Sequence, residues 1–358
     1  MDKNKLNNLW NLFLSKVDYN YPYIDAFNRV PSWSKKENPM SDLRLSDYLN
    51  QNSFKPTYPD GKKFALCISH DVDLLFLKDK KRILREVISD VSDKKIGKIV
   101  ASVQRGLTKK IHPYYDLKKI MNIEQKFNAN SSFFFLSLSK EDKDYNYELN
   151  QIGDVFDKLI KSKKEIGLHG GHDAFDNIHQ LKKEKDNLES FLGTKIKGYR
   201  GHYLKFKTPD TWLNLNELGF EYDTTFGFAE SIGFRNGTCY PFQPYDLSND
   251  RFLDLIEIPL MIMDTSIYNY MKINPVHIYN LLTEFIDRVA AYNGVVTLLW
   301  HNTDAYDPSY EMFHKILEYA HSKNAWMPSG EELIEYWKIE KLHEKQNEIL
   351  LHLKEKSC

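Results

Sequence analysis

Short apolar runs alternate with amphipathic stretches along most of the chain. An apolar run of four to eight residues bounded by polar or turn-forming residues is typical of a buried strand, whereas apolar residues spaced three and four apart indicate a helix. The expected strands lie at 64–69, 131–138, 165–168, 196–199, 220–222, 255–258, 295–300 and 325–327. The expected helices between them lie at 117–127, 152–161, 180–192, 209–218, 275–290 and 310–320, with a last one capped by Ser329. This alternation predicts a mainly parallel α/β fold.

The first 60 residues differ from the rest. They contain amphipathic helical patterns and a connector rich in proline and tyrosine, and a segment of this length is too short to bury a core of its own. We expect residues 1–60 to form a helical cap on a main body at 61–335, with 336–358 as a C-terminal helix. Within the main body, 224–253 is aromatic and irregular, which indicates a long functional loop or a pair of hairpin strands.

Composition narrows the class of protein. Of the 358 residues, 42% are hydrophobic and 14% aromatic, as in a globular, enzyme-sized protein. The net charge of −1 argues against nucleic acid as the principal partner. Cys67, Cys239 and Cys358 lie far apart without a Cys-x-x-Cys spacing, so neither a disulfide framework nor a thiolate zinc site is indicated. Because no apolar run reaches membrane-spanning length, we expect a cytoplasmic protein.

A stretch rich in lysine and arginine follows the first expected strand. Residues 74–105 combine these charges with apolar residues at helical spacing. A solvated helical face is the commoner meaning of such a pattern. The same pattern would also suit peripheral contact with an anionic membrane surface, or contact with a phosphorylated substrate.

Polar residues that could take part in catalysis or bind a metal fall at or just beyond the ends of the expected strands. In a parallel α/β barrel these ends converge on one mouth, so residues far apart in sequence become one site. A single histidine in a chain with 12 of them is weak evidence, because most histidines are structural. The repeated placement at strand ends is what indicates a site. The residues concerned are Asp71, Asp73, His169, His172, Arg200, His202, Asp223 and His301.

These residue types support metal-assisted hydrolysis. Carboxylate and neutral imidazole ligands suit zinc, and also cobalt, nickel or iron(II), better than magnesium or calcium. Such a metal, with one open position, lowers the pKa of its bound water to about 7 and polarises a carbonyl oxygen. A second carboxylate then accepts the proton of the water, and a histidine protonates the leaving nitrogen. Asp71, Asp73 and His301 can fill these roles.

Five motifs resemble, in sequence order, those of the polysaccharide deacetylase family, which is carbohydrate esterase family four. The resemblance covers roughly residues 61–335 and is closest to the cytoplasmic branch found with bacterial surface-polysaccharide biosynthesis. That branch carries similar Ser-His-Asp-Val-Asp and Arg-x-His-Tyr-Leu elements. The motifs in this chain are Ser69-His70-Asp71-Val72-Asp73, His169-Gly170-Gly171-His172-Asp173, Arg200-Gly201-His202-Tyr203-Leu204, Tyr222-Asp223-Thr224-Thr225 and Leu298-Leu299-Trp300-His301-Asn302.

The resemblance implies a fold, an activity and a set of roles. The fold is a distorted (β/α) barrel with fewer than eight regular strands and, in this chain, a small helical N-terminal cap. The activity is metal-dependent removal of an acyl group from an acetamido sugar. By resemblance, Asp71 is the catalytic base, Asp73 is the metal-binding carboxylate and His169 is the first metal-binding histidine. Arg200 is the arginine that holds the base, His301 is the catalytic histidine, and Asp223 is the carboxylate that supports this histidine.

One motif departs from the family pattern. Its two histidines usually stand four residues apart, but here His172 follows His169 by three and Asp173 by four. The third metal ligand is therefore open between His172, Asp173 and His202. Because Gly170 and Gly171 favour a tight turn over a regular helix, and because a neutral imidazole leaves the metal a stronger Lewis acid than a second carboxylate would, we predict His172. We assign His202, Tyr203 and Trp300 to substrate binding.

Two functions from different classes follow. The leading one is a zinc-type deacetylase acting on an N-acylated sugar, as a nucleotide- or lipid-linked precursor of a surface glycan. The alternative is a catalytically weakened relative that binds glycan or assists a biosynthetic assembly, an idea motivated by the altered second motif. A non-haem iron oxygenase fits the ligand types, but the chain lacks the usual His-x-Asp/Glu spacing of that class, and Arg200 and His301 would be unexplained.

Overall fold

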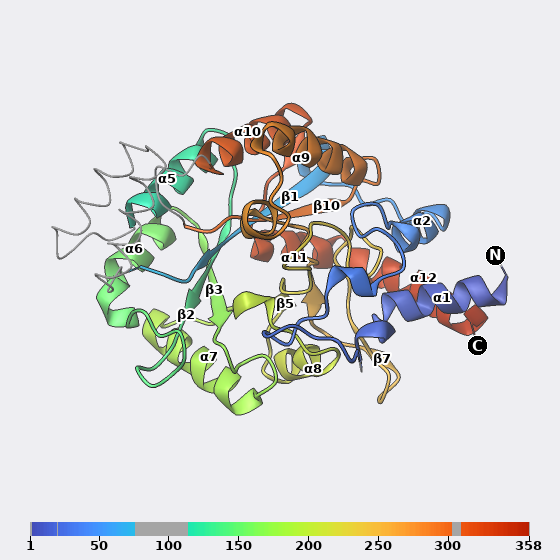
Figure 1. Cartoon of the computed structure of the whole chain (residues 1–358), viewed down its shortest axis with the longest axis horizontal. Helices are drawn as coiled ribbons and strands as arrows, with labels where there is room; N and C mark the ends of the chain where they lie inside the picture. The colour runs from blue at the N-terminus through green and yellow to red at the C-terminus, as the bar shows by residue number, and fades with distance from the viewer. Residues whose placement is uncertain (1, 20, 76–113, 303–308, 358) are drawn as a thin grey trace.

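The computed structural model describes residues 2–19, 21–75, 114–302 and 309–357, which are drawn as ribbon in Figure 1. The basic stretch at 74–105 therefore lies, apart from its first two residues, outside the described part of the chain. No helix within the described ranges is long and apolar enough to cross a membrane.

The core of the fold is one curled sheet of nine strands whose pairings are all parallel. The order across the sheet is β8-β5-β4-β3-β2-β1-β10-β9, with β11 also paired to β1. The strands are β1 (Phe64–Val72), β2 (Ser132–Leu136), β3 (Glu165–Gly170), β4 (Gly198–Gly201), β5 (Tyr222–Asp223), β8 (Ile256–Glu257), β9 (Ile262–Met263), β10 (Val295–Leu299) and β11 (Ala325–Trp326). This confirms the predicted distorted barrel, since several strands have only two residues.

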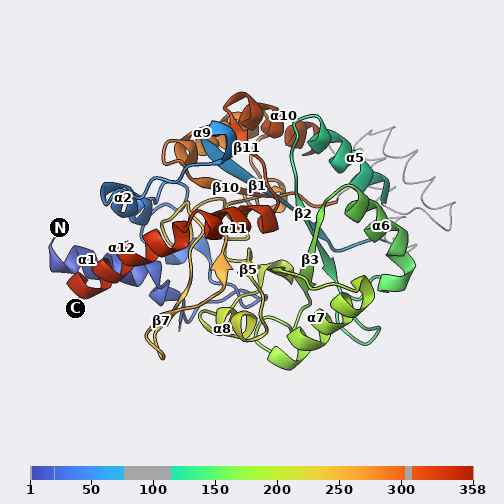
Figure 2. The same ribbon diagram turned by 180° about the vertical axis from the view of Figure 1, so that it is seen from behind.

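Helices surround the curled sheet (Figure 1). They are α5 (Tyr114–Gln125), α6 (Gly153–Lys161), α7 (Ile178–Leu192), α8 (Asp210–Glu217), α9 (Pro275–Ala290) and α10 (Ser309–Ser322). Helix α11 (Gly330–Ile339) instead crosses the middle of the barrel on the side that faces the viewer in Figure 2. Local sequence fixes where several of them begin. The Asn177 side chain accepts from the backbone of His179 and Gln180 at the start of α7, and Ser329 forms the expected cap of α11, completed by Glu332.

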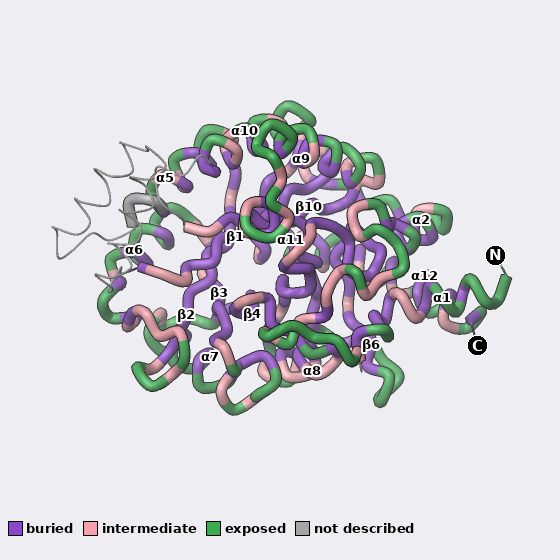
Figure 3. The backbone as a smooth tube through the Cα atoms, in the orientation of Figure 1, coloured by how far each residue is buried: buried purple, intermediate pink, exposed green. Residues whose placement is uncertain are grey.

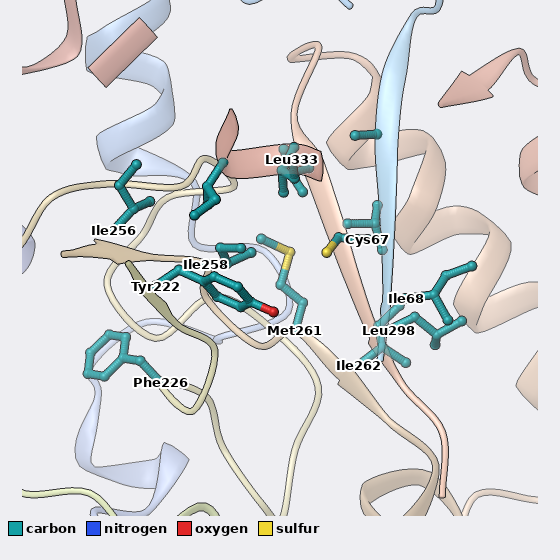
Figure 4. Close-up of a cluster of buried hydrophobic side chains, with 14 of the residues drawn as sticks. Cys67, Ile68, Tyr222, Phe226, Ile256, Ile258, Met261, Ile262, Leu298 and Leu333 are labelled. Carbon is teal, nitrogen blue, oxygen red and sulfur yellow. The ribbon is translucent and has the colours of Figure 1, made fainter. Parts of the chain in front are cut away.

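The inside of the barrel is filled by side chains. All nine residues of β1 are buried, and Cys67 on β1 faces Met261, Tyr222 and Leu333 in the interior cluster of Figure 4. Figure 3 shows the same division along the backbone, with buried strands inside and exposed positions on the outer helices. Because the interior is closed by packing, chemistry has to take place at an end of the barrel.

The N-terminal residues pack on the same core. Helices α1 (Lys3–Phe13) and α12 (Leu342–Ser357) lie side by side in both views (Figures 1 and 2), and α2 (Arg44–Gln51) follows in the cap. Asp18 is buried between Lys35, whose Nζ is 2.6 Å away, and Arg235, whose Nε is 3.1 Å away. The ion pairs fasten the cap to the loop that follows β5.

The irregular region 224–253 contains the expected hairpin. Strands β6 (Tyr245–Asp246) and β7 (Arg251–Phe252) pair in antiparallel fashion. Single helical turns complete the described chain at Lys16–Asp18, Ser32–Ser34, Pro59–Gly61, Leu149–Ile152, His202–Leu204 and Ser266–Tyr270, the last of which is a π-helix labelled η6.

A buried carboxylate at the opposite end of the barrel from the candidate site should make stability depend on pH. Glu165 accepts from the Tyr222 hydroxyl at 2.7 Å and from the Glu331 N–H of α11 at 2.9 Å, and burial raises its pKa from 4.5 to about 7. A raised pKa in the folded state adds stability that is complete below pH 4.5 and is lost as the pH rises to 7. We expect this difference to be about 3 kcal/mol.

Urea unfolding of the parent and of Glu165→Gln at a series of pH values measures the effect. The parent should lose stability relative to the variant between pH 4.5 and 7. Glu335→Gln, at an exposed partner of Lys197, is the control and should follow the parent. Parallel curves for the parent and Glu165→Gln would contradict the prediction.

Candidate active site

The polar residues predicted at strand ends do gather at one end of the sheet. In the parallel register, His169 of β3 lies opposite Arg200 of β4 and Asp71 of β1 lies opposite Phe134 of β2. Asp73 follows β1, and His301 follows β10, which pairs with β1. The carboxyl ends of these neighbouring strands therefore form one mouth, as expected for this class of fold.

Three side chains converge within this mouth. His169 Nε2 lies 2.9 Å from Asp73 Oδ1, and His202 Nδ1 lies 3.0 Å from His169 Nε2 and 3.5 Å from Asp73 Oδ1. Ligand atoms around a tetrahedral zinc ion lie about 3.3 Å apart, given metal–ligand bonds of about 2.0–2.1 Å. Asp73 Oδ1 is buried and has no hydrogen-bond partner among the described residues. The three side chains thus fit one divalent metal ion.

The two imidazoles are prepared to act as ligands. His169 Nδ1 lies 3.0 Å from the Arg200 carbonyl oxygen. Because a carbonyl only accepts, Nδ1 carries a proton, and Nε2 is the nitrogen that would coordinate a metal ion. Burial lowers the pKa of His202 to about 4, so this imidazole is neutral near pH 7. On its far side, His202 Nε2 lies 3.8 Å from Asp144 Oδ2.

The predicted third ligand, His172, lies elsewhere. Its ring contacts Asp173, at 2.7 Å, and the lysine Nζ atoms of Lys143 and Lys205, at 2.7 and 3.3 Å. Strand β3 continues through Gly170, two residues beyond the predicted end at 168, and His172 lies beyond the strand, outside the group formed by Asp73, His169 and His202. The structure places His202 in the third position instead, because β4 is the direct neighbour of β3. Asp173 also lies outside the triad.

Asp71 lies beside the triad without belonging to it. Its Oδ2 is 3.8 Å from His169 Nε2, and its Oδ1 is 3.5 Å from Arg200 Nη1. Arg200 is fully buried and donates from Nη2 to the hydroxyls of Ser69 and Thr224. The Arg200 guanidinium thus lies beside the Asp71 carboxylate, as the predicted pairing of these two residues requires.

The fifth-motif histidine is held by an aspartate that the sequence analysis missed. His301 Nδ1 lies 2.6 Å from Asp264 Oδ1, and the His301 N–H donates to Asp264 Oδ2 at 2.9 Å. Burial alone would lower the pKa of His301, but the Asp264 carboxylate raises it to about 10. His301 Nε2 lies 3.8 Å from Asp73 Oδ2, on the side of the site away from Arg200.

Asp223 does not have the predicted role of supporting His301. It is fully buried on β5 and accepts from the Thr225 N–H at 3.0 Å and from the Thr225 hydroxyl at 2.5 Å. Arg200 and Glu257 also act on this carboxylate. Asp264 contacts both the ring Nδ1 and the backbone N–H of His301 and therefore supports the histidine, whereas Asp223 acts on the Arg200 side of the site.

Two of the residues assigned to substrate binding also need correction. Trp300 is fully buried and packs against Phe313, with ring centroids 5.6 Å apart. It points into the helix layer and is therefore inaccessible to a substrate. His202 belongs to the triad. Tyr203, by contrast, is half-buried at the mouth and packs against His202 with the two rings tilted and their centroids 3.8 Å apart.

The histidine of the first motif is structural. His70 is fully buried, with Nδ1 2.7 Å from the Trp300 carbonyl oxygen and Nε2 2.9 Å from Glu124 Oε1. Glu124 is in turn paired with Lys164 at 2.8 Å. These contacts tie the end of β1 to the residue before His301 and so hold Asp71 and His301 in a fixed relation.

The Asp264 contact predicts a change in the pH dependence of any reaction in which His301 donates a proton. Asp264→Asn removes the main cause of the raised pKa, so His301 should lose its proton at lower pH. Activity that needs protonated His301 falls as the pH passes this pKa, and the alkaline limb of the pH–kcat profile should therefore move to lower pH. Asp223→Asn serves as comparison and should leave the limb in place. An unmoved limb in Asp264→Asn would contradict the assignment.

Comparison with known proteins gives the fold. No protein-family model and no curated protein matches the chain. Among solved structures, a candidate polysaccharide deacetylase from Mycobacterium smegmatis has a TM-score of 0.56 and 17% identity, over 80% of this chain and 94% of that one. The chain therefore has the (β/α) fold of polysaccharide deacetylases.

Two further solved structures are less similar. The peptidoglycan deacetylase of Bacillus subtilis has a TM-score of 0.41 and 11% identity, over 82% of this chain and 99% of that one. A carbohydrate esterase family 4 pseudoenzyme from Bacillus anthracis has a TM-score of 0.41 and 10% identity, over 77% of this chain and 66% of that one.

Proposed function

We propose that this protein is a metal-dependent hydrolase that removes an acyl group, acetyl in the first instance, from an N-acylated sugar. The observation that carries the proposal is the arrangement of the mouth. A triad of Asp73, His169 and His202 is flanked by a carboxylate held by arginine on one side and by a histidine held by Asp264 on the other. Metal-assisted amide hydrolysis uses a cation site, a general base and a general acid close together.

Different residues of the mouth would bind the metal ion, accept a proton and donate a proton. Asp73, His169 and His202 would hold the ion, and zinc is the metal that best suits one carboxylate and two imidazoles with an open position. When bound, the ion would supply an activated water molecule and polarise the acyl oxygen. Asp71, which lies beside Arg200, accepts the proton of the water. His301, kept protonated by Asp264, donates a proton to the leaving nitrogen.

The resemblance of the motifs supports the finer parts of the proposal. The five motifs are similar to those of the cytoplasmic branch associated with surface-polysaccharide biosynthesis. We therefore propose an N-acetylated sugar within a nucleotide- or lipid-linked glycan precursor as the substrate, and a cytoplasmic location. Both follow from the motif order, with its Ser69-to-Asp73 and Arg200-to-Leu204 elements.

Release of acetate tests the function. The purified full-length protein is treated with a chelator, then supplied with zinc or cobalt, and acetate is measured with N-acetylated mono- and oligosaccharides and a nucleotide-linked N-acetylated sugar. Chelation should abolish acetate release and the metal should restore it. Full activity without metal would refute the proposal. Saturable glycan binding without acetate release in the metal-loaded protein would favour the alternative of a glycan-binding relative.

A further inference from the structure

Three aromatic side chains of the N-terminal cap lie together on the surface. The rings of Tyr21, Tyr23 and Trp33 have centroids 6.0 to 6.4 Å apart, and Tyr23 and Trp33 are each 66% exposed. We call these three residues the aromatic surface. Large aromatic side chains gain most from burial, so a group of them left in water indicates a surface that binds something.

The segment that bears the aromatic surface is fastened to the mouth of the candidate site. Phe27 packs on Tyr203, with ring centroids 4.5 Å apart. Arg29 donates from Nη1 to the Tyr203 carbonyl oxygen at 2.9 Å and from Nη2 to the Tyr270 hydroxyl at 3.3 Å. Tyr203 directly follows His202, and Tyr270 ends η6, which follows β9. Arg29 therefore bridges two of the loops that border the site.

The aromatic surface is close enough to the mouth to touch a substrate that extends from it. Tyr23 is four residues from Phe27, and a fully extended chain of this length spans at most about 14 Å. Residues 22–26 of this segment are all exposed. A few linked sugar rings would cover the distance from the triad to the aromatic surface.

The chemistry of the segment favours a neutral ligand with flat apolar faces and hydroxyl groups. Between residues 21 and 33 the charged residues are Asp25 and Arg29, and they pair with each other at 2.6 Å. The segment thus offers no net charge to a polyanion or an anionic membrane. Aromatic rings supply flat faces for the carbon-bound hydrogens of a sugar ring, while the tyrosine hydroxyls and the indole N–H can exchange hydrogen bonds with its hydroxyls.

We propose that Tyr21, Tyr23 and Trp33 form a binding surface for sugar rings adjacent to the N-acylated sugar in the active site. The preferred substrate is then an oligosaccharide or a longer glycan, free or lipid-linked, in preference to a single sugar. This inference rests on the proposed function, because it takes the sugar in the mouth from there. It adds a residue set outside the five motifs that selects substrates by length.

Calorimetric titration and initial-rate kinetics test the surface separately from the chemistry. The full-length protein is titrated with neutral N-acetylated mono- and tetrasaccharides of glucosamine and galactosamine. The parent should bind at least one tetrasaccharide at least tenfold more tightly than its monosaccharide. Trp33→Ala and Tyr23→Ala should remove this preference and lower kcat/KM for the tetrasaccharide at least tenfold, with kcat/KM for the monosaccharide unchanged. Trp33→Phe should keep most of the preference.

A matched control comes from an exposed tyrosine elsewhere. Tyr279, on α9, is 37% exposed, and Tyr279→Ala should behave as the parent. The inference is overturned if no tetrasaccharide in the panel binds, if Trp33→Ala binds as tightly as the parent, or if Trp33→Ala changes only the oligomeric state in light scattering. The two proposals can fail separately. If the parent protein releases no acetate but Trp33→Ala still removes its preference for the tetrasaccharide in the binding titration, the proposed function is refuted and the glycan-binding surface is supported.

Discussion

His202→Ala should abolish metal binding and lower kcat more than about 10⁴-fold, the upper end of the loss for a single acid or base. The triad has two imidazoles and one carboxylate, so the variant keeps only two ligands, Asp73 and His169. Two ligands hold zinc far less tightly than the three that hold it in catalytic sites. Metal content after dialysis against buffered zinc, measured by mass spectrometry, and the rate of acetate release together check this result.

His172→Ala is the matched control for the metal experiment. Both variants remove one imidazole near the mouth, but His172 contacts Lys143, Asp173 and Lys205, away from the triad. His172→Ala should keep the metal at parental affinity. The reverse result, with metal lost in His172→Ala and kept in His202→Ala, would restore the ligand set that the sequence first predicted.

Asp71→Asn and His301→Ala should each lower kcat by about 10²- to 10⁴-fold while the metal content stays at the parental level. Neither side chain belongs to the triad, and each lies 3.8 Å from a triad atom. Asparagine cannot accept the proton of the attacking water, and alanine cannot donate one to the leaving nitrogen. The loss therefore falls on the chemical step.

Single-turnover rates and metal content separate the two roles. If Asp71→Asn loses the metal as well as the activity, Asp71 and Asp73 have been assigned the wrong way round. If His301→Ala retains more than a tenth of the parental kcat on an amide substrate, the proton donor has to be another group.

Much of the fold could be predicted because strands and helices have distinct periods. The apolar runs at β1, β2 and β10 and the helical spacing in α7 and α9 are long enough to be clear. The placement of Asp71, His169 and His301 followed from the same patterns, since each ends a recognisable run. What the sequence could not give was the exact residue at which β3 turns, and that one position decided between His172 and His202.

Other differences have local causes. Asp264 follows the apolar run that ends in β9, and a strict search for polar residues at every strand end would have found it. Asp144 lies in a loop between β2 and α6 without any periodic signal, so no sequence pattern pointed to its place beside His202. The assignment of Trp300 to the substrate failed because alternation along a strand does not tell which face is buried when helices cover the outside.

The turn after β4 places residues of the candidate site at a cost in stability. Tyr203 and Leu204 both have left-handed backbone angles, with φ of 58° and 55°, a conformation that costs residues other than glycine about 1–2 kcal/mol each. The turn directs His202 toward Asp73 and presents Tyr203 to Phe27. Glycine or asparagine at 203 would relieve this strain but lose the stacked ring, so selection for heat resistance alone would tend to accumulate substitutions here that weaken the site.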